Sequence, residues 1–250
     1  MLNIAVVNQS TVVKDGDASA WTDALQTQVS QDFFPVWGVD AKLTFLPGGK
    51  TAPAGNWVLA ILDNADQAGA LGYHDITPDG LPLGKVFAKT TIGDGGAVSV
   101  TASHELLEML GDPDINLTAE LDDGSGSPSK FYAYEVCDPC EDDQFGYKIN
   151  NVLVSDFVYP AYFESFRKPN STQFDHGKKI TAPFTLLAGG YMGVLDLGNL
   201  SEGWQQVTAS KSDRAAQVKA RARIGSRRER RRISRAHWVV SKYRTKAATA

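Results

Sequence analysis

Short apolar runs and segments with helical spacing alternate over the first 115 residues of the chain. Large apolar side chains at steps of four predict a helix over residues 18–33, and Pro35 and Gly38 are expected to end it. Residues 72–84 are rich in turn-forming residues and predict turns. A last helix, ending at Gly111, completes the predicted order β-α-β-β-β-α. Strands are predicted for four runs, at residues 3–7, 39–46, 57–62 and 85–91.

The last of these helices carries polar residues that can perform chemistry. His104 and Glu108 are four positions apart, so their side chains lie one above the other on a helix. Together they can bind one metal ion, with Glu105 beside them to accept a proton from bound water. A solvated polar face on an ordinary helix is the alternative interpretation. The opposite, apolar side of the helix is expected to contain Val100, Ser103, Leu106, Leu107 and Leu110.

The string His104-Glu105-x-x-Glu108-x-x-Gly111-x-x-Asp114 resembles the zincin metallopeptidase helix, and most of all its metzincin form, H-E-x-x-H-x-x-G-x-x-H or D. The resemblance implies that His104, Glu108 and Asp114 are metal ligands. It also implies that Glu105 is the general base and that Gly111 lets the chain turn. The string departs from the family at Glu108, where zincins have a second histidine. The element order also resembles the N-terminal half of zincins, and implies an α+β fold in which a twisted mixed sheet backs the active-site helix.

Residues 116–210 show a less regular pattern and are expected to form a C-terminal subdomain that completes the metal cleft. A tight turn is predicted at residues 189–193. Metzincins carry a methionine turn beneath the metal, so the resemblance implies that Met192 could be its counterpart and that Tyr191 could reach the metal. Extended structure is predicted at residues 131–136, at 147–154 as a hairpin, and at 180–187.

An acidic cluster after residue 134 offers alternatives for the third ligand. Glu135 or Asp138 could take this role in place of Asp114, which is slightly preferred. A solvated turn or a calcium-binding loop are the other interpretations of the cluster. Cys137 and Cys140 lie within it as C-D-P-C, a spacing for which two free thiols in a turn is favoured over a redox pair or a disulfide. The cluster comprises Glu135, Asp138, Glu141, Asp142 and Asp143.

The expected ligand set determines which metal ions are candidates. One imidazole and two carboxylates carry a charge of about −2, which would cancel the charge of a divalent ion. The ion would then acidify its water less than an ion bound by neutral histidines. Zinc is the expected cofactor, and manganese or calcium are alternatives because carboxylate-rich sites suit them.

Composition and charge divide the chain further. The 250 residues carry a net charge of −4, but residues 211–250 contain 14 Lys and Arg against 2 Asp and Glu, a balance of +12. The chain is therefore expected to contain a zincin-like subdomain over 1–115, a second subdomain over 116–210 and a basic tail over 211–250. The tail is expected to contact nucleic acid or an acidic protein surface, or else to be a solvated arm. Its central arginines are Arg227, Arg228, Arg230, Arg231, Arg232 and Arg235.

Two functions from different classes agree with these features. The first is a metal-dependent peptidase-like hydrolase that cleaves peptide or protein substrates with a metal-bound water activated by Glu105. The second is a non-catalytic assembly or binding protein on a zincin scaffold, whose basic tail contacts a partner. The sequence has no apolar run of 18 residues and no signal-peptide pattern, so no membrane partner is expected. The expected location is cytoplasmic, or virion-associated if a phage encodes the protein.

Overall fold

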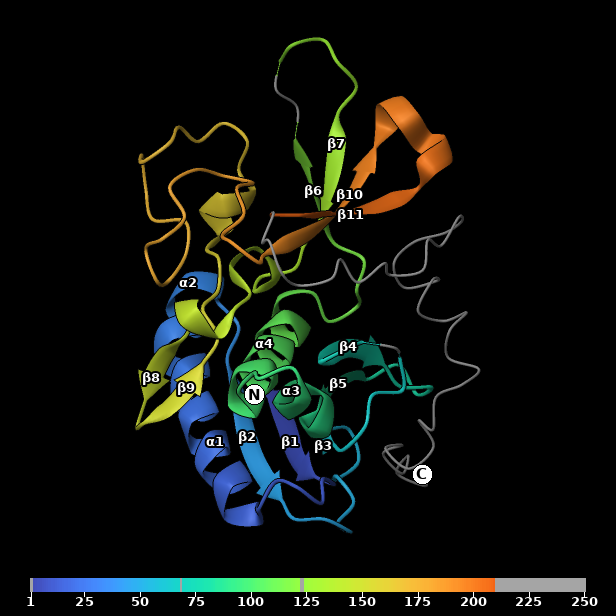
Figure 1. Cartoon of the computed structure of the whole chain (residues 1–250), viewed down its shortest axis with the longest axis vertical. Coiled ribbons are helices and arrows are strands. Elements are labelled where there is room, and N and C mark those ends of the chain that lie inside the picture. The colour runs from blue at the N-terminus through green and yellow to red at the C-terminus, as the bar shows by residue number, and fades with distance from the viewer. Residues whose placement is uncertain (1, 68, 122–123, 210–250) are drawn as a thin grey trace.

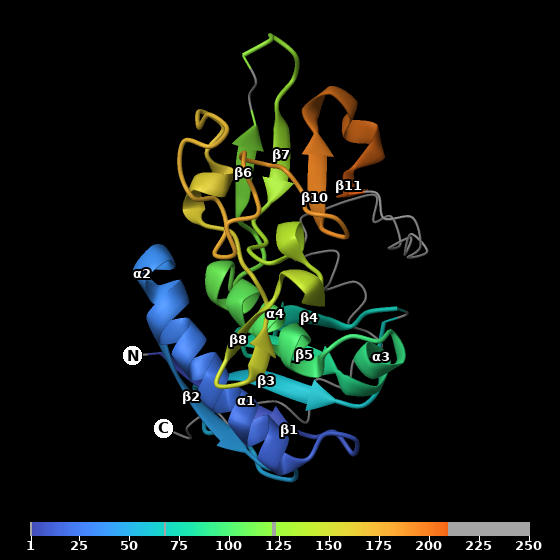
Figure 2. The ribbon, with the colours of Figure 1, turned by 60° about the vertical axis from the view of Figure 1, so that its left-hand side comes forward.

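The computed structural model describes residues 2–67, 69–121 and 124–209, which form a mixed α+β structure with two main sheets (Figure 1). The predicted α+β class is confirmed. A five-stranded sheet lies at one end of the molecule and a four-stranded sheet at the other, with helix α4 (Val98–Gly111) between them (Figures 1 and 2). Because α4 lies between the two sheets, side chains from both halves of the described chain can meet at this helix.

The five-stranded sheet is mixed, and its central strand is β3. Its order is β2-β1-β3-β5-β4, in which β4 at the edge is antiparallel to β5 and the other neighbours are parallel. The parallel pairing of β1 with β2 requires a crossover, which helix α1 (Asp15–Thr27) supplies. The strands span Leu2–Asn8 (β1), Ala41–Leu46 (β2), Trp57–Leu62 (β3), Gly72–Ile76 (β4) and Pro82–Phe87 (β5).

Two predictions for this sheet are wrong. Strand β4 occupies the first part of the segment predicted as turns, and β5 covers only residues 85–87 of the strand expected at 85–91, because helix α3 (Ala88–Gly93) begins there. The physical reason is that β4 and β5 bury polar side chains, so neither reads as an apolar run. His74 is 0% exposed, and Lys85, at 1% exposed, forms an ion pair with Asp66 at 2.6 Å.

The helices α1 and α4 cover one face of the sheet and make the larger core. The predicted helix at 18–33 is confirmed and runs further, through a π-helical segment (Gln28–Phe33) into α2 (Phe34–Trp37). Proline is tolerated in the first turn of α2, so Pro35 does not end the helix, and Gly38 does so in a left-handed conformation. Side chains of both long helices, the sheet and the C-terminal half share this core.

The C-terminal half contains a second sheet, which is more regular than the sequence indicated. Its four antiparallel strands have the order β11-β10-β7-β6. The predicted hairpin is confirmed as β8 and β9, whereas residues 180–187 form no strand. The strands span Thr118–Leu121 (β6), Lys130–Ala133 (β7), Tyr147–Ile149 (β8), Val152–Val154 (β9), Tyr191–Asp196 (β10) and Trp204–Thr208 (β11). Short 3-10 helices span Asp138–Cys140 (η2), Asp143–Phe145 (η3), Pro160–Phe163 (η4) and Leu197–Glu202 (η5).

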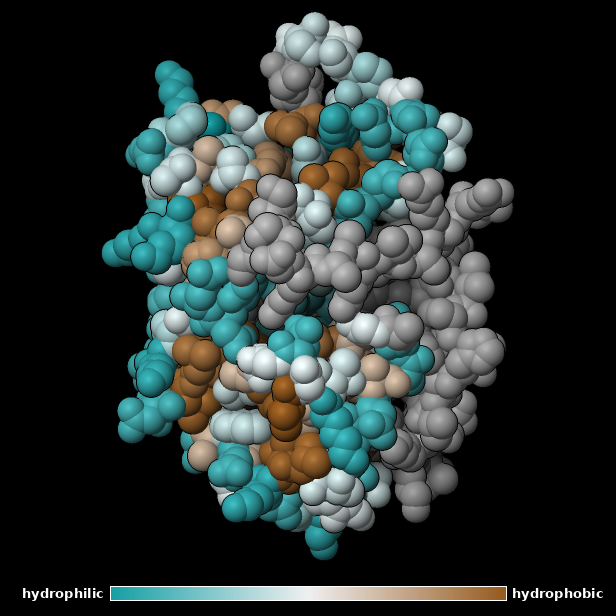
Figure 3. Space-filling model, in the orientation of Figure 1, coloured by the Kyte–Doolittle hydropathy of each residue, from teal (hydrophilic) through white to brown (hydrophobic). Residues whose placement is uncertain are grey.

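The surface mixes hydrophilic and apolar side chains. On the face shown in Figure 3, apolar residues appear in separate patches between hydrophilic ones. Among the described residues, Phe166 is the most exposed large apolar side chain at 74%. Over that same part of the chain, no helix is long and apolar enough to cross a membrane.

Gly111 is the last residue of α4, and it serves close packing and not a left-handed turn, which corrects the role that the resemblance implied. Its φ lies outside the left-handed region, and a Cβ at this position would lie 2.9 Å from Cγ1 of Val136. Val136 is fully buried. The absence of a side chain at Gly111 therefore lets the helix end approach the segment that carries Glu135.

Gly111→Ala is expected to lower the free energy of unfolding by about 1–2 kcal/mol. The new methyl group would overpack against the stiff Val136 side chain. This overpacking destabilises the fold by more than the higher helix propensity of alanine stabilises it. Denaturant unfolding measures this change. In a Val136→Ala background the same substitution should be close to neutral, and an equal loss in both backgrounds would contradict the packing argument.

Two buried aspartates, Asp156 and Asp175, lie next to each other. Asp156 accepts hydrogen bonds from the backbone N–H groups of Phe157 and Gly177, and Asp175 accepts from those of Lys179 and Ile180. Burial, the hydrogen bond with Asp175 and the charge of Asp175 raise the pKa of Asp156 from 3.8 to about 8. The folded state therefore keeps a proton on Asp156 that the unfolded chain loses near pH 4.

This raised pKa predicts a loss of stability with rising pH. The contribution of Asp156 to the free energy of unfolding is fully present below about pH 4 and is lost as pH rises through about 8. The reason is that the unfolded chain releases this proton at lower pH than the folded protein does. Asp156→Asn imitates the protonated acid and should remove this part of the pH dependence. Chemical unfolding at several pH values between 4 and 9 measures both curves, and parallel curves for the two proteins would contradict the assignment.

Candidate metal centre

Helix α4 is buried on all sides. Every residue from Val98 to Leu110 is buried, so the polar side of the helix faces the protein interior. His104 is 7% exposed, and Glu105 and Glu108 are 4% exposed each. The interpretation of this stripe as a solvated face is therefore wrong. Buried charged side chains need partners of opposite charge or a bound ion.

His104 meets two carboxylates through one ring nitrogen. Its Nε2 atom lies 3.2 Å from Oε1 of Glu108, one helical turn away, and 3.2 Å from Oδ1 of Asp138. Asp138 begins the 3-10 helix η2 and is 6% exposed. The three side chains place one ligand atom each within 4.8 Å of one another and can hold a metal ion.

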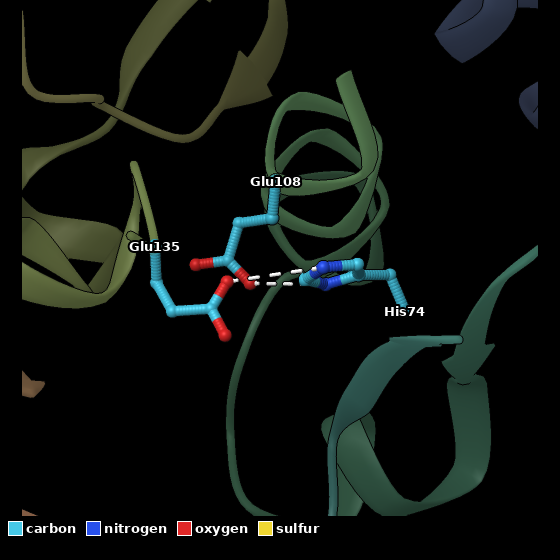
Figure 4. Close-up of side chains that lie close together, drawn as sticks. All are labelled: His74, Glu108 and Glu135. Atoms are coloured by element: carbon cyan, nitrogen blue, oxygen red, sulfur yellow. Dashed lines mark ion pairs between the residues drawn. The ribbon is translucent and has the colours of Figure 1, made fainter. Parts of the chain in front are cut away.

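A second group forms on the other side of Glu108. The His74 ring, from strand β4, points toward the carboxylates of Glu108 and Glu135 (Figure 4). Its Nδ1 atom lies 3.5 Å from Oε2 of Glu108, and its Nε2 atom lies 3.8 Å from Oε2 of Glu135. These three side chains are also close enough together, within 4.8 Å, to hold a metal ion.

The structure does not bring all predicted ligands together. Asp114, the preferred third ligand, is exposed and belongs to neither group. The two alternative third ligands each belong to one of the groups: Asp138 lies beside His104, and Glu135 lies beside His74. The geometry therefore favours the residues after β7 over Asp114, because that segment returns to α4 where the helix end packs against Val136.

The carboxylates around His104 determine its protonation. Burial alone lowers the pKa of His104, but the charge of Glu108 and the close approach of Asp138 outweigh burial and raise this pKa well above its usual value. Burial raises the pKa of Glu108, and the two neighbouring histidines reverse this and lower it well below its usual range. The surroundings thus favour positive charge next to Glu108, and a divalent cation can take the place of the protons there.

Glu105 lies against the edge strand of the sheet. A Cβ at Gly72 would come within 2.6 Å of Oε1 of Glu105, so the carboxylate occupies the space that this glycine leaves open. Gly72 and His74 are two residues apart on β4 and therefore share a face of the sheet. The expected general base is thus buried beside the strand that carries His74.

Tyr191 and Met192 lie in strand β10, and the turn predicted at residues 189–193 is instead made just before them, where the N–H of Gly190 donates to the carbonyl of Leu187. Burial, then the charges of Asp138, Glu141 and Glu108, raise the pKa of Tyr191 well above its usual value, as does a hydrogen bond with Asp138. Tyr191 therefore reaches the cluster as a neutral phenol. Met192 is buried and its sulfur accepts a hydrogen bond from the hydroxyl of Tyr162 at 3.1 Å.

The cysteines of C-D-P-C are free thiols. Cys137 and Cys140 are both buried, and the Cys140 thiol donates to the backbone carbonyl of Cys137 at 3.5 Å. Burial raises the pKa of each thiol well above its usual value, so both remain protonated. Neutral, buried thiols are poor nucleophiles and poor metal ligands, and they pack the segment that carries Asp138.

Sequence reasoning missed His74. The residue follows no motif, and its strand was predicted as turns. The chain has only four histidines, so each one deserved consideration as a ligand, and this scarcity was the available signal. The arginines of the basic tail, and the tail as a whole from residue 211, lie outside the described residues.

Comparison with known proteins adds no family. No family model matches the chain, and neither a curated protein nor a solved structure matches it. What the site can do must therefore be argued from its own geometry.

Asp138→Asn is expected to lower the affinity for a divalent ion by about 10-fold or more, whereas Asp114→Asn should leave it unchanged. The first substitution removes a charge 3.2 Å from His104, and the second changes an exposed residue outside both groups. Elemental analysis after dialysis against a metal buffer measures both variants. A loss confined to Asp114→Asn would restore the ligand set implied by the metzincin resemblance.

Proposed function

We propose that the protein is a divalent-metal-dependent hydrolase of peptide bonds in which Glu105 is the general base. The main observation in support is the buried group of His104, Glu108 and Asp138, with Glu105 adjacent to His104 on the same helix. Metal ligands and a carboxylate base on one helix are the arrangement of the zincin motif that the sequence resembles.

The donor set fits a divalent ion. It contains one imidazole and two carboxylates, all nine-tenths buried or more, and the three are held by α4 and η2. Zinc is the proposed ion because it accepts nitrogen and oxygen donors in a tetrahedral site, with manganese as an alternative for a site this rich in carboxylate. When bound, such an ion supplies a Lewis acid that polarises a carbonyl and acidifies water.

The chain's own residues support hydrolysis in three ways. Glu105 offers a buried carboxylate that can accept a proton from water. Tyr191, next to Asp138, offers a neutral hydroxyl that can donate to an oxygen that gains negative charge. Strand β4 is an edge strand that pairs with β5 among the described residues, and an extended peptide can add to such an edge beside His74 and Glu105.

Glu105→Gln is the experiment that tests the proposal. Glutamine keeps the shape of the side chain and should leave metal binding intact while it lowers turnover of a peptide substrate by about 10²- to 10⁴-fold, the range for a general base. Cleavage of an unfolded protein and of a fluorogenic peptide library, with zinc and then with manganese, measures this. Glu120→Gln, an exposed carboxylate on β6, is the matched control and should keep full activity.

Two results would reject the proposal. One is a wild-type protein that contains its metal and cleaves no substrate with either ion, which would favour the binding-protein alternative. The other is full activity of Glu105→Gln, which would remove Glu105 from the reaction.

A further inference from the structure

The two carboxylate oxygens of Glu108 face two different sets of side chains. Oε1 lies 3.2 Å from Nε2 of His104, on the side of Asp138. Oε2 lies 3.5 Å from Nδ1 of His74, on the side of Glu135. Glu108 is therefore the only member that the two groups share.

The two groups have the same composition. Each contains one histidine, one carboxylate of its own and one oxygen of Glu108, and all five side chains are buried. They come from four separate parts of the chain: β4, α4, the segment after β7, and η2. This repetition around one carboxylate is not required by a site for a single ion.

The distances between these side chains suit ligands of an ion better than direct ion pairs. Two ligand atoms bound to one tetrahedral zinc, each about 2.0–2.1 Å from it, are about 3.3 Å apart. The two contacts of His104, both through Nε2, are 3.2 Å long. His74 makes its contacts through two different ring nitrogens, Nδ1 at 3.5 Å and Nε2 at 3.8 Å, so only one of these contacts can join two ligands of the same ion. Charge-assisted hydrogen bonds between an imidazolium and a carboxylate are shorter, about 2.7–2.9 Å. In addition, the buried Oε1 of Glu108 makes no hydrogen bond of acceptable geometry, although His104 is next to it.

We propose that this cluster binds two divalent ions, bridged by the carboxylate of Glu108. His104, Asp138 and Oε1 of Glu108 hold the first ion, and His74, Glu135 and Oε2 of Glu108 hold the second. One carboxylate that bridges two ions sets them about 3.5–4 Å apart, the separation in two-metal hydrolases. The inference rests on the proposed function only in that the first ion is the metal of that proposal.

Charge supports two ions in this space. Glu105, Glu108, Glu135 and Asp138 are four carboxylates gathered around α4, and two neutral imidazoles add no charge. One divalent ion would cancel two of these four negative charges, and two ions would cancel all four. Uncompensated charge is costly in a buried site, so these four carboxylates, three of which are ligands in the proposal, are better matched by two ions than by one.

Metal stoichiometry of the full chain tests the inference. Apo protein titrated with Mn²⁺ and then dialysed should retain two ions per chain by elemental analysis, and the two ions should give an exchange-coupled electron paramagnetic resonance spectrum. Glu135→Gln and His74→Ala should each retain one ion with an uncoupled spectrum. Glu108→Gln should lose the coupling, because it removes the bridging charge from both sites. His176→Ala, a histidine stacked on Tyr147 and Phe157 outside both groups, is the matched control and should retain two coupled ions.

The outcomes separate this inference from the proposed function. A wild-type protein that retains one ion, whether or not it cleaves peptides, overturns the two-ion site. Two ions with no coupling, or coupling that survives Glu108→Gln, overturns the bridge. Two coupled ions in a protein that cleaves no peptide support the inference and reject the peptidase alone. Glu135→Gln preserves side-chain shape, so its ion count decides the matter if His74→Ala does not fold.

Discussion

The buried carboxylate of Glu108 lies between two histidines from different parts of the fold, and the rest of the cluster depends on this placement. A carboxylate that is 4% exposed is costly unless positive charge surrounds it. His104 approaches one oxygen from the same helix, and His74 approaches the other from strand β4. Every element that contributes a side chain to the cluster must therefore keep a fixed position relative to α4. The geometry of the site thus depends on the packing of the core.

Small and polar residues hold α4 in this register. Gly111 lets the end of the helix touch Val136, and Gly72 leaves space for the Glu105 carboxylate against the edge strand. On the opposite side of the helix, Ser103 donates to Gln28 at 2.7 Å, and Gln28 in turn donates to the backbone of Ser155. This buried network ties α4 to the first helix and to the C-terminal half, so the position of the ligands is fixed by contacts that are not themselves ligands.

The glutamate that departs from the zincin pattern has a physical meaning in the proposed centre. An imidazole has one nitrogen free to bind an ion when the other is protonated, whereas a carboxylate has two oxygens that can each face a different partner. At position 108 the two oxygens do face two separate groups. A histidine there would serve one group only, and His74 and Glu135 would then lack the ligand that joins them to α4.

The sequence by itself determined the elements whose signals are local. Helical spacing located the long helices, apolar runs located β1 and β3, and alternation of apolar and polar residues located β2. The positions of His104, Glu105 and Glu108 on one helix followed from the residue spacing alone. The tertiary structure decided what lies opposite that helix. Strand β4 and His74 were hidden because buried polar residues do not read as an apolar run, and Asp138 meets His104 across 34 residues of chain. Contacts of this kind depend on how segments pack, and spacing along the sequence does not encode them.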